Sequence, residues 1–166
     1  MHSFTPDPTR TTDLRRALGQ FGTGVALITV HSDAGPIGMT ANSFSSVSLD
    51  PPLVLWSAAR TSKRHDAFAG ASAFCIHVLS AAQMDVANHF AKQGHDFSPY
   101  AYDAGPNGAP TLHGCLATFH CDTYAVHLAG DHSIILGQIT AAAIQPEERD
   151  GLLFKRGTFG RFTPSV

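Results

Sequence analysis

The chain has 166 residues and a mass of 17.6 kDa, which corresponds to one domain of ordinary size. Apolar residues make up 43% of the chain and charged residues 14%, so an intrinsically disordered protein is excluded. The net charge of -2 provides no field for binding nucleic acid, and no apolar stretch approaches the ~20 residues of a membrane-spanning helix. The first residues lack the apolar segment of a secretory signal, and the 3 cysteines have no CxxC spacing. We therefore expect reduced thiols and a cytoplasmic protein.

The first third of the chain predicts an arm, one helix and four strands. Residues 1–10 contain two prolines and are interpreted as a flexible arm that precedes a single domain over 11–166. A helix is predicted from about residue 11 to Phe21, because Leu14, Ala17, Leu18 and Phe21 form one apolar stripe. Strands are predicted over 25–30, 37–42, 46–49 and 53–58, where apolar and polar residues alternate or β-branched residues run together.

The rest of the chain predicts two more helices and further strands. A short helix is expected over 61–70 and a strand over 73–79. A longer helix over 80–93 begins with Ser80 and Gln83 at the spacing of a capping box. Its buried side is expected to carry Val86 and Phe90, continued by Met84, Ala87 and Ala91. Residues 94–110 predict a long functional loop or lid. Strands over 115–127 and 132–144, joined as a hairpin, and a short strand within 151–162 complete an antiparallel barrel or sandwich with a few helices.

The segment 40–48 is rich in hydroxyl groups. It offers hydroxyls, an amide and backbone N–H groups without a fixed charge, from Thr40, Asn42, Ser43, Ser45, Ser46 and Ser48. Such groups hold a phosphate or a polyol chain. The alternative is the solvent face of an edge hairpin, where serine and threonine are routine.

A cationic turn follows the next predicted strand, at Arg60-Thr-Ser-Lys-Arg64. Thr61 or Ser62 would cap the short helix, which would place Lys63 and Arg64 in its first turn. The helix dipole disfavours cations there unless an anion is bound, so the segment is interpreted as a phosphate-binding turn. The alternative is that both side chains extend into solvent, where salt screens the penalty. One strand separates this turn from the hydroxyl-rich segment, so both can address one ligand.

The remaining candidates are single residues. Gly130 and Asp131 suit a hairpin turn, whereas His132 is a candidate to stack on a planar ligand or donate to it. The 10 histidines show no metal-binding spacing, so no metal site is predicted. The sequence also lacks a nucleophile elbow and a glycine-rich phosphate loop. Cys75 and Cys121 lie within apolar strands and are predicted to be buried and inert.

In their order along the chain, several motifs together resemble the flavin reductase-like family: Phe21-Gly-Thr-Gly-Val25, the run from Gly38 to Leu53, Gln83, Phe90-Ala91, and Gly130-Asp-His132 with Gly137. The resemblance covers about residues 14–162. It implies a mainly β fold with flanking helices, a Greek-key split β-barrel of the FMN-binding type, which forms a homodimer with flavin near the interface. It also implies that NADH or NADPH passes a hydride from nicotinamide C4 to N5 of FMN or FAD. The reduced flavin would then diffuse to a flavin-dependent monooxygenase.

The resemblance also implies roles for individual residues. The flavin ring and ribityl chain would be lined by Met39, Thr40, Ala41, Asn42 and Ser43, with Ser46, Val47 and Ser48 close to them. The flavin phosphate would be bound by Arg60, Thr61, Ser62 and Lys63. From the capped helix, the flavin would be approached by Phe90, Ala91 and Lys92. His132 would contact the nicotinamide, and Phe159 and Arg161 would bind NAD(P)H. Many members carry a tyrosine near the last glycine. Here Phe154 and Phe159 stand in that region, so stacking is available but a phenol hydroxyl is not.

Two other classes of protein stay open at this point. One is a non-catalytic flavin-binding electron carrier of the same fold. The other is a split-barrel protein for another planar ligand, such as haem or a pyridoxal derivative. The sequence also leaves open whether the flavin is FMN or FAD and whether the reductant is NADH or NADPH. Residues 94–110 are candidates to control the choice between FMN and FAD.

Overall fold

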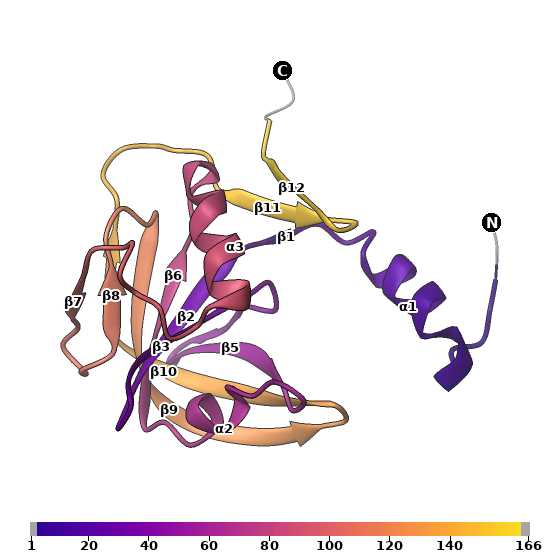
Figure 1. The fold of residues 1–166 in the computed structure, drawn as a ribbon, viewed down its shortest axis with the longest axis horizontal. Helices are drawn as coiled ribbons and strands as arrows, with labels where there is room; N and C mark the ends of the chain where they lie inside the picture. The colour runs from indigo at the N-terminus through magenta and orange to yellow at the C-terminus, as the bar shows by residue number, and fades with distance from the viewer. Residues whose placement is uncertain (1–2, 164–166) are drawn as a thin grey trace.

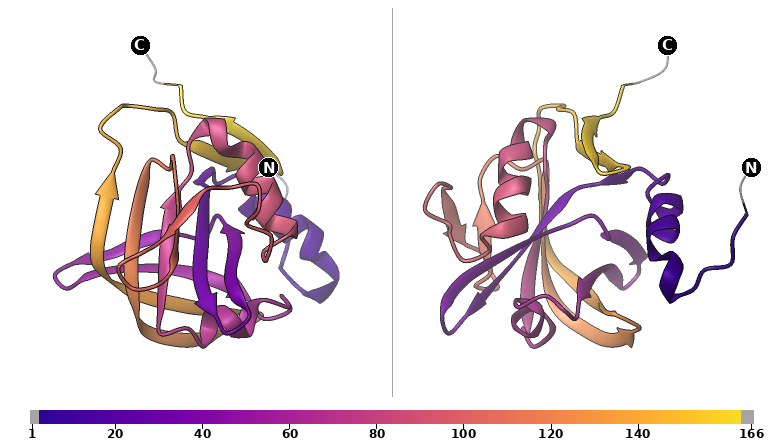
Figure 2. Two further views of the ribbon diagram at one scale, coloured as in Figure 1. Left: turned by 60° about the vertical axis from the view of Figure 1, so that its left-hand side comes forward. Right: turned by 45° about the vertical axis from the view of Figure 1, so that its right-hand side comes forward.

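An antiparallel sheet of 7 strands, in the order β3-β2-β6-β9-β10-β5-β4, forms the body of the protein. The computed structural model describes residues 3–163, and the sheet curls into a barrel (Figures 1 and 2). This confirms the mainly β prediction. The strands are β2 (Ala26–Ser32), β3 (Gly35–Ala41), β4 (Ser45–Leu49), β5 (Pro52–Ala59), β6 (Ala73–Val78), β9 (Ala117–Ala129) and β10 (His132–Ile144).

Two hydrophobic cores lie on opposite sides of β2, which explains why this strand is apolar on both faces. Ile28 points into the barrel and packs in one core with Trp56 and Phe74. Leu27 points outward and packs in the other core with Phe90 of the helix α3 (Met84–Lys92). The barrel therefore carries α3 on its outer surface, across β2 and β3 (Figure 1).

Helix α3 is shorter than the predicted helix 80–93. A 3-10 turn, η2 (Ala81–Gln83), precedes it, and the predicted capping box is confirmed: the Ser80 N–H donates to Gln83 Oε1 over 3.0 Å. The prediction that Met84 and Ala91 are buried was wrong, since both are exposed. Val86, Ala87 and Phe90 are buried as predicted. At about 100° per residue, Met84 and Ala91 lie beyond Ala87 at the edge of this stripe, where they reach solvent.

The N-terminal helix α1 (Thr11–Leu18) stands at one side of the barrel and buries none of its residues (Figure 1). The predicted stripe exists, but Leu18 is 66% exposed and Phe21 78% exposed. Ahead of α1, a 3-10 turn η1 (Pro8–Arg10) is capped by Asp7 within the predicted arm. Residues 1–2 of that arm and residues 164–166 of the predicted domain lie outside the described residues.

The C-terminal segment forms a hairpin rather than the single predicted strand. Strands β11 (Leu152–Lys155) and β12 (Thr158–Arg161) pair with each other, and β11 also pairs with the short β1 (Thr23–Gly24). The prediction missed the turn because Arg156-Gly157 is an unusual turn sequence.

The segment 94–110, predicted as a loop or lid, packs on the sheet. It contains β7 (Tyr102–Ala104) and leads into β8 (Pro110–Leu112). Its Phe97 and Ala109 are buried, and Asn107 donates to the carbonyl oxygens of Phe74 and Cys121 at 3.3 and 3.1 Å. These contacts attach the segment to β6 and β9.

His77 of β6 lies beneath this segment and is fully buried. One ring nitrogen, Nδ1, is 3.1 Å from the Leu27 carbonyl oxygen, and the other, Nε2, accepts from the Leu112 N–H over 3.0 Å. A ring that donates at one nitrogen and accepts at the other is neutral. Burial accordingly lowers the pKa of His77 to about 4.

We expect acid to destabilise the fold through His77. The unfolded side chain titrates near pH 6.5, so between pH 6.5 and about 4 the unfolded chain binds a proton that the folded chain does not. The free energy of unfolding falls across this window, by about 3 kcal/mol at its lower end. Urea denaturation at several pH values measures it. His77→Gln should reduce the slope and the exposed His31→Gln should keep it, while an unchanged slope in His77→Gln would contradict the assignment.

Candidate functional site

The hydroxyl-rich segment and the cationic turn are neighbours in the fold. The Ser43 hydroxyl donates to the Ser57 carbonyl oxygen over 3.2 Å and accepts from the Ser57 N–H over 2.9 Å. These bonds attach the segment that follows β3 to β5, and β5 runs directly into the turn. From the turn, Arg64 donates to the Gly38 carbonyl oxygen of β3 over 2.7 Å. The hydroxyl-rich segment and the cationic turn are therefore connected by hydrogen bonds to the same pair of strands, β3 and β5.

Arg64 points inward and binds the end of α3. Its guanidinium donates to the carbonyl oxygens of Phe90 and Ala91 over 2.6 and 3.0 Å. A cation at this end of a helix is favoured by the dipole and satisfies carbonyls that lack a helical partner. Burial lowers the pKa of Arg64, which still stays charged. A Cβ on Gly94 would lie 2.5 Å from the Gly38 carbonyl oxygen, the same oxygen that Arg64 binds, so glycine is needed there.

The helix after the turn, α2 (His65–Ala69), begins four residues later than predicted. The prediction that Lys63 and Arg64 lie in the first turn of a helix was therefore wrong. The physical reason is a tight turn: the Ser62 hydroxyl accepts from the Arg64 N–H over 3.2 Å, and the Ser62 carbonyl from the His65 N–H over 3.0 Å. Arg60, Thr61 and Lys63 are exposed on it. Any anion would be held by the side chains and N–H groups of this turn.

The tip of the β9–β10 hairpin lies against the same turn. The Arg60 N–H donates to the Asp131 carbonyl oxygen over 2.9 Å, and Arg60 Nη1 donates to the Gly130 carbonyl oxygen over 3.2 Å. A third bond joins His65 Nε2 to the buried Ser133 hydroxyl at 2.9 Å. His132 is thus placed next to the turn, with its side chain 42% exposed. Its hydrogen bond to Asp131 lowers the pKa of that carboxyl group.

A narrow slot of about 200 Å³ lies between α3, β3 and the β11–β12 hairpin. Two phenyl rings, those of Phe154 and Phe159, form one wall with their centroids 5.2 Å apart. The Thr40 hydroxyl donates to the Ala87 carbonyl oxygen over 2.7 Å and holds α3 against β3. Aromatic and small side chains suit a flat ring system. The slot is lined by Val25, Thr40, Ala41, Asn42, Ala87, Ala91, Phe154 and Phe159.

The other residues singled out in the sequence differ in accessibility. The side chain of Met39 lies in the barrel core, and the fully buried Phe90 packs on Phe97 and would meet a Cβ at Gly38, so both support the site from behind. Arg161 and Arg149 line a groove of about 650 Å³ that adjoins the slot, because Phe159 lines both. The accessible residues are Asn42, Ser46, Val47, Lys92 and, partly, Ser43, Ser48 and Ser62.

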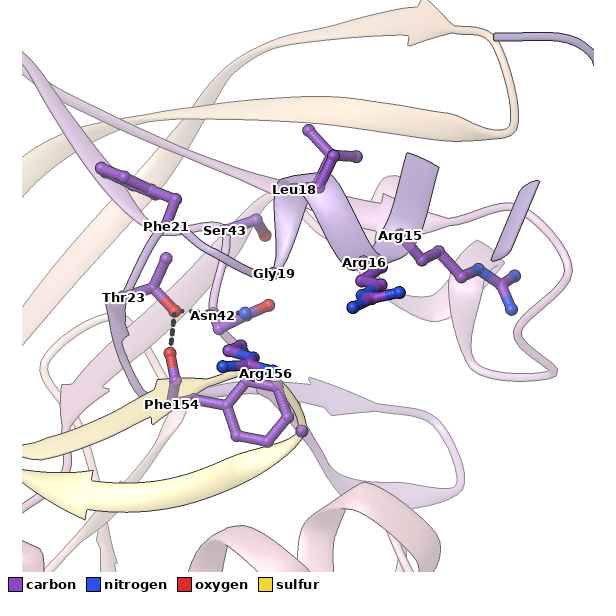
Figure 3. A pocket seen from close by; sticks show the side chains of 12 residues that line it. Arg15, Arg16, Leu18, Gly19, Phe21, Thr23, Asn42, Ser43, Phe154 and Arg156 are labelled. Atoms are coloured by element: carbon purple, nitrogen blue, oxygen red, sulfur yellow. Dashed lines mark hydrogen bonds between the residues drawn. The ribbon is translucent and has the colours of Figure 1, made fainter. Parts of the chain in front are cut away.

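A larger cavity of about 1120 Å³ adjoins the slot, because Asn42 and Phe154 line both (Figure 3). The Asn42 amide donates to the Thr23 hydroxyl over 3.2 Å at their junction. The sequence analysis assigned no role to Arg16 and Arg156, which line this cavity. These arginines lie far apart in the sequence, and the bond from the Arg156 N–H to the Gly19 carbonyl oxygen brings the β11–β12 turn beside the end of α1.

Within residues 3–163, no three His, Cys, Asp or Glu side chains are grouped to hold a metal ion. The helices of this part of the chain are all too short or too polar to cross a membrane. The cysteines at 75, 115 and 121 are free and buried, which confirms the prediction for Cys75 and Cys121. Burial raises the pKa of each thiol, that of Cys115 to about 11, so none is a nucleophile at neutral pH.

A β-barrel with a slot for a flat ring, a hydroxyl-rich strand end and an exposed cationic turn defines a protein that binds planar, phosphate-bearing ligands. The sequence model of the flavin reductase like domain matches residues 18–163. The chain belongs to this family.

Similar proteins agree with this assignment. The chain is 48% identical over 164 residues to the FMN reductase (NADH) SmoA of Agrobacterium fabrum, covering 98% of this chain and 92% of that one. It is 43% identical to the reductase component of the flavin-dependent trigonelline monooxygenase of Acinetobacter baylyi, covering 92% of this chain and 49% of that longer protein. The structure of Streptomyces globisporus NADH:FAD oxidoreductase SgcE6 in complex with NAD and FAD fragments superposes with a TM-score of 0.90 at 38% identity, covering 99% of each chain.

We expect Arg64→Met to lower the free energy of unfolding by about 2–3 kcal/mol, because three carbonyl oxygens lose a charged donor. Arg64→Lys should recover only part of the loss, since an ammonium lacks the planar fork of donors. Urea denaturation measures both variants. The exposed Lys63→Met is the control and should change stability by less than about 0.5 kcal/mol. Equal losses in Arg64→Met and Lys63→Met would contradict the assignment.

Proposed function

We propose that this chain is a flavin reductase that uses NADH or NADPH to reduce FMN or FAD. The observation that carries the proposal is that the hydroxyl-rich segment and the cationic turn are neighbours. Ser43 bonds to Ser57 of β5, and Arg64 of the turn bonds to Gly38 of β3. A flavin mononucleotide presents a flat ring, a polyol chain and a phosphate in that order. The slot, the hydroxyl-rich segment and the turn offer matching surfaces.

In this proposal the ring is held at the slot, between the alanines of α3 and β3 and the phenyl rings of Phe154 and Phe159. Thr40 already donates to α3, so its contribution to the ring is to fix the width of the slot. Ala41, Asn42 and Ser43 line the ring and ribityl chain, with Ser46, Val47 and Ser48 beside them. Ala91 and Lys92 approach from the end of α3, whose position depends on Arg64.

The phosphate is assigned to the turn formed by Arg60, Thr61, Ser62 and Lys63. Arg60 also donates to Gly130, which leaves Lys63 as the exposed cation most free to bind an anion. Because α2 has only 5 residues, its dipole adds little, and charge and hydroxyl contacts supply the affinity. Moderate affinity suits a flavin that leaves after reduction.

His132 is assigned to the nicotinamide of the reductant. It sits on the hairpin tip that Arg60 and Ser133 hold against the phosphate turn. Flavin, when bound, accepts a hydride from the nicotinamide at N5, so the protein needs no nucleophile or strong base. The side chains orient the two ligands and bring them close together. The buried, free cysteines are not needed as nucleophiles in such a reaction. Phe159 and Arg161 are the further residues assigned to NAD(P)H.

We also propose that reduced flavin passes by diffusion to a monooxygenase component. Support comes from relatives that are named as reductase components of monooxygenases. The free thiols are compatible with the reducing cytoplasm expected from the sequence.

A homodimer is proposed from the outer half of β9. Strand β6 pairs with β9 as far as Asp122, and the Thr123 N–H donates to the Ser72 carbonyl oxygen over 2.8 Å. Within the described residues, β9 has an unpaired edge from Tyr124 onward. On this half, Tyr124, Val126 and Leu128 recur at every second position and are 57%, 38% and 75% exposed. An apolar stripe beside an unpaired edge is the kind of surface that a second copy covers.

Two variants test the flavin and nicotinamide sites against each other in steady-state reduction assays. Lys63→Met should raise the KM for FMN about tenfold while leaving the KM for riboflavin, which has no phosphate, and for NADH unchanged. His132→Ala should raise the KM for NADH and leave the KM for FMN unchanged. Each variant is the control for the other.

The reductase proposal fails if the wild-type protein does not accelerate the oxidation of NADH or NADPH by FMN or FAD. Tight flavin binding without that acceleration would indicate the electron carrier instead. If Lys63→Met changes the KM for FMN and the KM for riboflavin equally, the assignment of the phosphate to the turn is wrong.

Sedimentation velocity tests the dimer. We expect the wild-type protein to sediment as a dimer and Leu128→Lys to shift it toward the monomer, because a charge in a buried apolar contact is costly. Leu49→Lys, on the exposed edge strand β4, is the matched control and should sediment as wild type. A wild-type monomer at micromolar concentration would overturn the proposal.

A further inference from the structure

His65, the first residue of α2, connects the cationic turn to the β9–β10 hairpin. The helix α2 lies at one end of the barrel (Figure 1), where its Phe68 packs edge-on against Trp56 in the core, with ring centroids 5.3 Å apart. With the helix fixed in this way, His65 Nε2 lies 2.9 Å from the hydroxyl oxygen of Ser133 on β10. Neither side chain lines the slot or the larger cavity, so an effect of this bond on a ligand passes through other residues.

The two hydrogen-bond partners of His65 differ in exposure. Its Nδ1 is 2.8 Å from a carboxylate oxygen of Asp66, whose side chain is fully exposed, whereas Ser133 is fully buried. A carboxylate only accepts, so Nδ1 donates to it, and Nε2 of the neutral ring then accepts from the Ser133 hydroxyl. Water can replace the exposed bond at little cost, but a buried hydroxyl without a partner is costly. The bond to Ser133 is therefore the one that fixes the ring.

Bonds from the turn attach to the hairpin on both sides of His132. Before His132, Arg60 bonds to the carbonyl oxygens of the two residues at the hairpin tip over 3.2 and 2.9 Å. After it, His65 bonds to Ser133. Side chains alternate between the faces of a strand, so His132 points to the face opposite the buried Ser133 and stays 42% exposed. The backbone of His132 is thus held from both sides while its side chain stays accessible.

Arg60 and His65 also stand at the two ends of the turn that the proposed function assigns to the flavin phosphate. Residues 61–63 lie between them. A guanidinium has five N–H donors, so Arg60 can bind an anion and keep its bond to the hairpin. An anion bound to the turn restricts the motion of the turn, and Arg60 and His65 transmit this restriction to the hairpin. A nicotinamide that binds at an already ordered His132 then loses less free energy to ordering.

We propose that His65 is a positioning residue that couples the two ligands: a flavin phosphate on the turn tightens the binding of the nicotinamide nucleotide at His132, through the bond from His65 to Ser133. The inference rests on the proposed function, because it uses the phosphate and nicotinamide positions assigned there. It deepens that function by making the two affinities interdependent, and the nicotinamide nucleotide must tighten binding of the flavin phosphate by the same factor. An enzyme without flavin then holds its reductant weakly.

Riboflavin and NAD⁺ allow the coupling to be measured without the reaction. Riboflavin has the ring and ribityl chain of FMN but no phosphate, and NAD⁺ has the nicotinamide but no hydride to transfer. The Kd for NAD⁺ is measured by isothermal titration calorimetry on protein saturated with FMN and on protein saturated with riboflavin. We expect the wild type to bind NAD⁺ about fivefold more tightly with FMN than with riboflavin.

Two substitutions of His65 separate its two bonds. Glutamine places an amide near the position of Nε2 and can still bond to Ser133, whereas asparagine places one near Nδ1 and lies too far from Ser133. We expect His65→Gln to keep most of the difference between FMN and riboflavin, and His65→Asn to abolish it. Ser133→Ala should abolish it as well, and Asp66→Ala, which removes only the exposed bond, should keep it.

The double variant and thermal melting distinguish coupling from a loss of stability. His65→Asn combined with Ser133→Ala should behave like either single variant, because both changes remove the same bond. Melting followed by circular dichroism shows whether each variant is folded. A merely destabilised protein binds NAD⁺ more weakly with both flavins, so the ratio of the two Kd values stays that of the wild type.

The inference is overturned if the wild type binds NAD⁺ equally well with FMN and with riboflavin, or if the difference persists in His65→Asn or in Ser133→Ala. In either case a wild type that reduces flavin leaves the reductase proposal intact. Failure of the proposed function has another signature: the difference is present and depends on His65, but flavin does not accelerate the oxidation of NADH. A protein that binds neither FMN nor NAD⁺ overturns both proposals.

Discussion

The inward-pointing guanidinium of Arg64 is the contact on which the site depends. One side chain joins β3 at Gly38, the end of α3 at Phe90 and Ala91, and the turn that carries Lys63. These parts are separated by at least 26 residues in the sequence. A planar cation with several donors can satisfy three carbonyl oxygens in different directions, which neither a lysine nor a water-filled gap would do with the same rigidity. The close approach of Gly94 completes the enclosure.

The same turn is attached on its other side to the β9–β10 hairpin, through Arg60 and through the bond from His65 to Ser133. The surfaces assigned to the phosphate and to the nicotinamide are therefore parts of one rigid unit. The slot and the adjoining cavity lie where this unit meets α3, α1 and the C-terminal hairpin. The protein contributes positions, cations and apolar walls, and the redox chemistry belongs to the ligands it binds.

The elements that the sequence predicted well are those whose signals are local. Alternation located β3 and β4, and an apolar run located β5, to within a few residues. Ser80 with Gln83 marked the start of the α3 region. The ordered motifs from Gly38 to Leu53 identified the family, which the match over residues 18–163 confirms. The errors arose where packing decides. The start of α2 moved to His65 because Ser62 closes a tight turn. Met84 was wrongly assigned to the buried face because it lies at the edge of the stripe formed by Val86, Ala87 and Phe90.

The sequence by itself determined the mainly β architecture, the family, and the segments 40–48 and 60–64 as the places to search for a binding site. Patterns of hydrophobicity, turn residues and helix caps involve residues that are close together in the chain, so they can be recognised from the sequence alone. Only the tertiary structure decided that Arg64 faces inward, that the stripe of α1 lines a cavity instead of the core, and that Arg16 and Arg156 line the same cavity. Such contacts join residues far apart in the chain, and their energies depend on which groups the folded barrel brings together.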